Sequence, residues 1–193
     1  MKFYESGDNR KPVIFLFPGT CCLYSSFDHV LDGLHSYFYT VTVSYDGFDP
    51  NEKTEFYSME DECEKIEQEI RKKYGGRIYL VAKIQSSMVV PFMYKMVHTG
   101  TLPKFVQKKL DKTDGGKKEL YNGFLNMFGI GKGGSPWITK QSICNQFYSD
   151  LVTKVQHGID VPGTTIHVFY ATKMGEKYEK RYCTYFKNPD IRK

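Results

Sequence analysis

The stretch that decides the fold is RIYLVAKIQSS, residues 77–87. Its first part, Arg77–Val81, is a short apolar run of the kind found in buried strands. The apolar, Met-rich segment Ile84–Val97 follows directly and predicts a buried helix. The stretch therefore predicts a strand that leads straight into a helix, a corner at which many enzymes place a reactive side chain.

Two further strands are expected before this stretch. Val13–Phe17 is a continuous apolar run that stops at Pro18, and Tyr39–Tyr45 is β-branched and aromatic. Continuous rather than alternating hydrophobicity is typical of strands covered on both faces, as in a parallel sheet. A helical pattern over Ser26–Tyr37 separates the two strands.

The clearest predicted helix begins after Ser58, a suitable N-cap, and ends at Gly75-Gly76. Acidic residues fill its first turn, where the helix dipole favours negative charge. One apolar stripe is expected along it, formed by Met59, Cys63, Ile66 and Ile70. Cys63 is accordingly interpreted as a small core residue rather than a reactive thiol.

The C-terminal part continues the alternation of helices and strands. Thr139–Val155 predicts a long amphipathic helix, Thr165–Ala171 a strand, and Glu176–Phe186 a final helix. Strands that alternate with helices are typical of an α/β fold with a mostly parallel sheet and flanking helices. The 193 residues suit a single domain, 1–193.

Composition narrows the functional classes. The net charge of +5 is mild, and the lysine-rich stretch 104–118 could form a phosphate or membrane-surface patch. Interspersed Asp111, Asp114 and Glu119 favour the solvated face of surface helices instead, and no nucleic-acid partner is expected. Five cysteines without metal-ligand spacing, and no signal peptide or membrane span, predict a cytoplasmic protein with reduced thiols, no metal and no cofactor.

Five segments resemble, in order, those of the α/β-hydrolases. They are VIFLFPGT (13–20), YTVTVSYDGF (39–48), SMEDECEKIEQEIRKKYGG (58–76), RIYLV (77–81) and VPGTTIHVFYATKMGEKYEKRY (161–182). The resemblance implies that residues 93–151 form a helical cap, or lid, over the site. It also implies hydrolysis of a carboxylic ester or similar acyl bond by a serine nucleophile.

The resemblance further implies a site after the first of these strands. A tight turn there can direct backbone N–H groups at a developing oxyanion, and Gly19, Thr20 and Cys21 occupy it. The cap would shape an apolar pocket, so an apolar or acyl small molecule is the expected ligand.

The family's nucleophile motif, G-x-S-x-G, does not follow RIYLV. The residues at this position are Ala82-Lys83-Ile84-Gln85-Ser86, and Ile84 occupies the position of the nucleophile. Ser86 is the nearest candidate nucleophile, with Ser87 beside it, although both also suit an ordinary helix cap. One buried strand that the family places before the cap has no counterpart until Thr165, which suggests that an internal segment is absent.

Besides the serine, the catalytic triad of this family contains an acid and a histidine, and this sequence represents both incompletely. Glu176 is the candidate acid, although its place at a helix N-terminus favours an ordinary carboxylate stabilised by the helix dipole. The family's histidine lies beyond the final strand, and none of the five histidines matches that position. The sequence therefore predicts an esterase-like protein that is inactive or severely impaired. The alternatives are a non-catalytic small-molecule-binding or interaction protein on a remnant fold, or an incomplete product.

Overall fold

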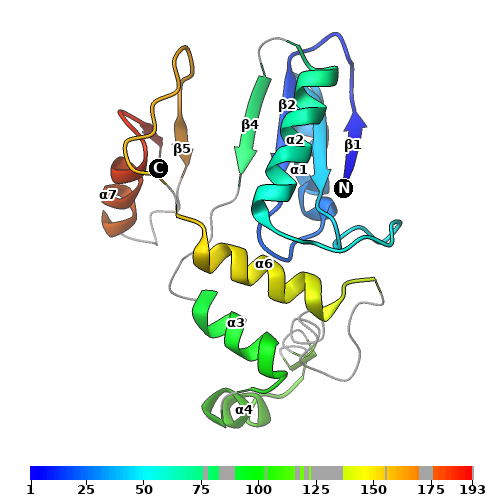
Figure 1. The fold of residues 1–193 in the computed structure, drawn as a ribbon, viewed down its shortest axis with the longest axis vertical. Coiled ribbons are helices and arrows are strands. Elements are labelled where there is room, and N and C mark those ends of the chain that lie inside the picture. The colour runs from blue at the N-terminus through cyan, green and yellow to red at the C-terminus, as the bar shows by residue number, and fades with distance from the viewer. Residues whose placement is uncertain are drawn as a thin grey trace. The chain divides into compact units, whose positions relative to one another are not determined.

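The computed structural model describes residues 1–75, 78–82, 90–102, 104–115, 118–119, 122, 137–154, 156–169 and 176–192. The chain divides into two compact units, Met1–Val152 and Thr153–Lys193. Each unit is described by itself, and the first contains the larger sheet (Figure 1).

The sheet of the first unit has four strands in the order β1-β3-β2-β4. They are β1 (Lys2–Ser6), β2 (Val13–Phe17), β3 (Tyr39–Ser44) and β4 (Ile78–Ala82). The central strand β2 runs parallel to β3 and β4, with Phe15 opposite Val41 and Leu80. The three predicted strands and their parallel arrangement are confirmed.

Strand β1 was not expected, because the sequence predicts only a polar lead before Val13. It pairs antiparallel with β3 at the edge of the sheet. An edge strand with one solvated face needs few apolar residues, so its pattern is weak. The Glu5 carboxylate on this strand accepts hydrogen bonds from Lys73 Nζ (2.6 Å), Tyr39 Oη (2.6 Å) and Tyr74 Oη (2.5 Å). These donors lower the pKa of Glu5 to about 2.

Helices cover both faces of the sheet. On one face Phe15 makes an edge-on contact with Tyr74, which follows α2 (Met59–Lys73), at 5.1 Å between ring centroids. The neighbouring side chains Ile14 and Leu16 point to the opposite face because side chains alternate along a strand. There they meet α1 (Asp28–His35) and the short 3-10 helix η1 (Tyr24–Phe27).

Helix α2 begins as predicted, with Ser58 Oγ accepting a hydrogen bond from Asp61 N at 3.2 Å. The expectation for Cys63 is wrong, because its side chain is exposed. Glu62 is buried in its place, next to the half-buried Ile66. The other residues of the predicted stripe, Met59, Ile66 and Ile70, do pack against the core. Only the Cys63 position departs from the pattern, because Glu62 is held inside by a backbone donor described below.

After β4, the described part of the first unit includes the helices α3 (Val90–Thr99), α4 (Lys104–Asp111) and α6 (Lys140–Val152). Helix α6 packs against α3 and runs across the carboxyl-terminal end of the sheet (Figure 1). Its residues Ile143 and Phe147 belong to the same buried cluster as Phe15 and Val41. The apolar pattern predicted for this helix, at four-residue steps from Ile143, is thus confirmed at these two positions. It is wrong at the next, because Leu151 is 39% exposed.

The second unit contains β5 (His167–Phe169), α7 (Glu176–Tyr185) and β6 (Asp190–Arg192). Strands β5 and β6 pair in parallel, and His167 Nδ1 lies 2.7 Å from Asp190 Oδ2. The described parts of the chain hold six strands, and none of them lies between α3 and β5. No helix in these parts has the length and apolar character needed to cross a bilayer.

Candidate functional site

The loop after β2, at the carboxyl-terminal end of the sheet, contains the predicted oxyanion residues. It makes a tight turn in which Cys22 N donates to Gly19 O at 2.9 Å. Cys21 is buried and has φ +57°, in the left-handed region that costs most non-glycine residues roughly 1 kcal/mol. Contacts from elsewhere must therefore stabilise this turn.

Helix α6 supplies those contacts. Cys21 N donates a hydrogen bond to Gln146 Oε1 at 2.6 Å, inside the protein. One turn further along the helix, Asp150 Oδ2 accepts from Thr20 Oγ1 at 2.8 Å. Burial raises the pKa of Asp150, and the Thr20 hydrogen bond partly offsets this effect. Two consecutive loop residues are thus bonded to two side chains on one face of α6.

The same helix also binds the segment that joins β3 to α2. Ser142 Oγ accepts from Phe56 N at 3.0 Å, and Asn145 Nδ2 donates to Phe56 O at 2.9 Å. Ser149 Oγ accepts from Met59 N at 3.2 Å. Because these bonds satisfy backbone groups beside the core, α6 is an integral part of the first unit.

This arrangement limits what the loop can do chemically. An oxyanion hole needs N–H groups whose hydrogens are available to a substrate oxygen. The Cys21 N–H is directed at the neutral amide oxygen of Gln146, so a substrate oxygen would first have to displace that side chain. Burial raises the pKa of the Cys21 thiol well above its ordinary value, which disfavours the nucleophilic thiolate.

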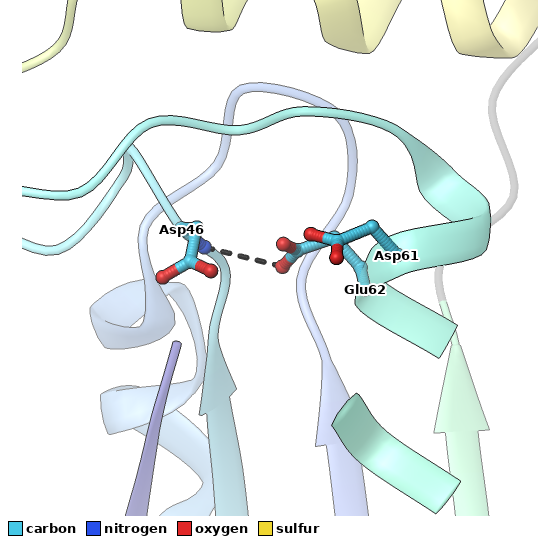
Figure 2. Close-up of side chains that lie close together, drawn as sticks. All are labelled: Asp46, Asp61 and Glu62. Carbon is cyan, nitrogen blue, oxygen red and sulfur yellow. Dashed lines mark hydrogen bonds between the residues drawn. The ribbon is translucent and has the colours of Figure 1, made fainter. Parts of the chain in front are cut away.

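A second polar cluster lies where β3 leads into the following loop (Figure 2). Its carboxylates, from Asp46, Asp61 and Glu62, have oxygens within 4.8 Å of one another. Glu62 Oε2 accepts from Asp46 N at 3.1 Å, the bond drawn in Figure 2. Burial raises the pKa of Glu62 to about 7.

Two ammonium groups already balance these carboxylates. Lys65 Nζ lies 2.6 Å from Asp46 Oδ2 and 3.5 Å from Glu62 Oε1, and it also contacts Asp61. The Met1 amine contacts Asp46 as well. Three carboxylates are ligands that a hard divalent cation accepts, but here they surround a lysine. The sequence contains a signal for this cluster: Asp46 directly follows the predicted strand Tyr39–Tyr45, and three acidic residues, 60–62, lie in the first turn of a predicted helix.

A pocket of about 420 Å³ lies between β2 and α1. Its lining is mainly apolar, and the lining residues in the described part of the chain are Ile14, Leu16, Gly19, Ser26, Phe27, His29, Val30 and Leu34. The sequence predicts a pocket beneath the cap, whereas this one lies on the sheet face that α1 partly covers. Its volume falls within the range of small-molecule sites.

No family model and no curated protein matches the sequence. Solved structures do match. An α/β-hydrolase family protein from Desulfitobacterium hafniense aligns with 98% of this chain and 89% of its own, at 11% identity and a TM-score of 0.60. A marine microorganism esterase aligns with 98% of this chain and 88% of its own, at 13% identity and a TM-score of 0.62. This chain has the α/β-hydrolase fold.

The α/β-hydrolase fold is compatible with more than one chemistry. 1H-3-hydroxy-4-oxoquinoline 2,4-dioxygenase is also similar, at 15% identity, with a TM-score of 0.56 and coverage of 98% of this chain and 86% of its own. At such identities the similarity establishes the fold, and function depends on the residues of the site.

The structure describes four of the five predicted α/β-hydrolase site residues, and it places them in two different units. Gly19, Thr20 and Cys21 lie together in the loop after β2. Ser86, the candidate nucleophile, lies outside the described residues, just beyond the end of β4. Glu176, the candidate acid, is the first residue of α7 in the second unit, and its side chain is exposed.

His35, in the first unit, contacts two hydroxyl groups. Its Nε2 atom lies 2.9 Å from Ser6 Oγ and 3.1 Å from Thr40 Oγ1. Thr40 is near the start of β3, whereas Cys21 follows the end of the parallel strand β2. His35 is therefore at the opposite end of the sheet from the predicted oxyanion loop.

Sequence reasoning missed Gln146 and Asp150, the side chains that engage the loop. The apolar residues of Thr139–Val155 predict only a helix that packs on the core. A polar stripe accompanies it at 142, 146, 149 and 150, with the three- and four-residue spacing of one helix face. Such a stripe on a buried helix indicates bonding to polar groups inside the protein.

Proposed function

We propose that this α/β-hydrolase-fold protein has little or no turnover of carboxylic esters. The observation that carries the proposal is the buried hydrogen bond from Cys21 N to Gln146 Oε1 at 2.6 Å. It gives the expected oxyanion donor an internal acceptor. Losing one oxyanion donor costs about 100- to 1000-fold in the rate of acyl transfer.

The sequence after β4 supports the same proposal. Ala82 to Ser86 contain no glycine, so the strained turn of the G-x-S-x-G motif is not expected there. Without an exposed serine and a histidine base, only the residual effects of a pocket and of backbone donors would remain. The cap, residues 93–151, is proposed to be a fixed part of the fold, with α6 bonded to two loops.

An active-site fluorophosphonate probe tests this proposal. We expect no labelled peptide containing Ser86 or Ser87, and p-nitrophenyl ester hydrolysis within about tenfold of the rate with heat-denatured protein. The Ser86→Ala and Ser87→Ala variants serve as a matched pair. Labelling that Ser86→Ala removes and Ser87→Ala leaves intact, with saturable ester hydrolysis, would establish a working nucleophile and end the proposal.

A second candidate function is the binding of an apolar small molecule in the pocket between β2 and α1. Its apolar lining and volume of about 420 Å³ favour this role. A ligand there would contact Leu16 on the strand and Val30 on the helix. No reacting group would be needed for binding of this kind.

Filling the pocket tests the binding function. Val30 lines the pocket and is 37% exposed, so Val30→Trp should occupy its volume with little effect on folding. We expect a medium-chain fatty acid to bind saturably to the natural chain and at least about tenfold more weakly to this variant. Val152→Trp, at a position that is 48% exposed and outside the pocket, is the matched control. Equal binding by both variants would rule out this pocket.

A further inference from the structure

A serine and a histidine lie in contact at the end of the sheet away from the loop after β2. Strand β1 ends at Ser6, which the antiparallel register places opposite Thr40 of β3. Thr40 is in turn opposite Ile14 of β2, so these side chains share the face of the sheet that α1 covers. Helix α1 ends at His35. The register of the sheet and the end of this helix therefore bring a hydroxyl and an imidazole together.

The two shortest contacts of this group both involve the Ser6 hydroxyl. Ser6 Oγ lies 2.7 Å from Thr40 Oγ1 and 2.9 Å from His35 Nε2. Thr40 Oγ1 lies 3.1 Å from His35 Nε2 and 3.1 Å from the backbone oxygen of Ser6. Hydroxyl groups usually donate to oxygen over about 2.5–3.0 Å, which favours the two shorter contacts. When the imidazole hydrogen is on Nδ1, Ser6 donates to Nε2 and Thr40 donates to Ser6 Oγ.

Neighbouring groups hold His35 beside Ser6. The Lys11 ammonium lies 2.6 Å from the backbone oxygen of His35, which fixes the end of α1. On another side, Gly7 has φ +93°, and a Cβ added to it would lie 3.0 Å from His35 Cδ2. The imidazole ring is thus confined by the backbone of Gly7. Ser6 and His35 are half-buried and Gly7 is exposed, so solvent and small molecules can reach the pair.

This arrangement is that of a nucleophile beside its base. An activated hydroxyl and its base usually lie about 2.6–3.2 Å apart, and the contact between Ser6 Oγ and His35 Nε2 falls within this range. A base placed in this way typically accelerates a reaction by about 100- to 10,000-fold. Ser6 should therefore be far more reactive than a serine that only meets water.

We propose that Ser6 is a nucleophilic site that accepts the acyl group of an activated ester. Its Oγ forms a bond to the carbonyl carbon while its proton passes to His35 Nε2. The bond from that carbon to the ester oxygen then breaks, and His35 returns the proton to the departing alcohol. The product is one acyl group bound to the chain, so the proposal is independent of ester turnover and of the loop after β2.

Acetyl transfer from p-nitrophenyl acetate to the full chain tests the proposal. Mass spectrometry of tryptic peptides locates the acetyl group, and Ser6 lies in the peptide Phe3–Arg10. Ser25, which is exposed, is the internal reference. We expect acetylation of Ser6 to be at least about 100-fold faster than that of Ser25. His35→Gln should remove most of this difference, because the amide is not a base.

A second histidine variant separates the base from any general effect of losing an imidazole. His157→Gln changes an exposed histidine of the second unit and should alter the rate at Ser6 less than about twofold. Equal rates at Ser6 and Ser25 in the natural chain would overturn the proposal, as would a folded His35→Gln protein that keeps the full rate at Ser6. Should His35→Gln not fold, the comparison of the two serines in the natural chain decides the question by itself.

Discussion

Replacement of Gly47 by alanine is expected to cost the first unit at least about 3 kcal/mol of unfolding free energy. Gly47 follows β3 with φ +77°, a conformation that side chains rarely adopt. An added Cβ would lie 2.8 Å from Phe56 N and would overlap Ser142 Oγ. The clash involves backbone on one side and a core helix on the other, so neither neighbour can move cheaply.

Urea denaturation followed by circular dichroism measures this effect. Gly33→Ala is the matched control, because Gly33 lies in α1 and its added Cβ would meet nothing within 4 Å. That control should gain about 0.5–1 kcal/mol from helix propensity. Ser142→Gly alone removes the acceptor of Phe56 N and is expected to destabilise the protein. The double variant Gly47→Ala with Ser142→Gly should nevertheless lose less than the sum of the two single losses, because the overlap with Ser142 Oγ is then gone. A Gly47→Ala protein within about 1 kcal/mol of the natural chain would refute the close packing of α6 on this turn.

The buried Glu62 is expected to make the protein less stable as pH rises from 4.5 to about 7. The pKa of Glu62 is about 7 in the folded state, above its ordinary value of 4.5, so the folded state binds the proton more tightly than the unfolded state. Ionisation inside the protein is therefore unfavourable despite the nearby Lys65. The free energy of unfolding of the Glu62→Gln variant, measured relative to that of the natural chain, should therefore be roughly 2 kcal/mol higher at about pH 8 than at pH 4.5.

Denaturation curves at several pH values test this expectation, with Glu5→Gln as the comparison. Glu5 has a folded pKa of about 2, below its ordinary value of 4.5, so its ionised form stabilises the fold. That stability is present above pH 4.5 and is lost as pH falls towards 2. The two variants should therefore depart from the natural chain with opposite signs. A difference between natural chain and Glu62→Gln that stays constant from pH 4.5 to 8 would show that Glu62 is not held in the buried state.

The local pattern of apolar and turn residues was sufficient to predict most strands and helices of the first unit. The apolar run of β2 matches its predicted bounds, and α2 has the predicted N-cap at Ser58. Strand β1 was missed because a solvated edge strand has little hydrophobic pattern. The cap assignment and the roles of Ser86 and Glu176 stay predictions.

The sequence by itself determined the α/β order of strands and helices, the parallel sheet, and the resemblance to the α/β-hydrolases, because periodicity and turn residues are local signals. Tertiary structure alone decided that Glu62 rather than Cys63 faces inward, since Asp46 N supplies a partner for its carboxylate. It also decided that Gln146 accepts a hydrogen bond from the Cys21 amide, although the two residues are 125 positions apart in the chain. A hydrogen bond between such distant residues depends on how a helix packs over a loop, which no local pattern records.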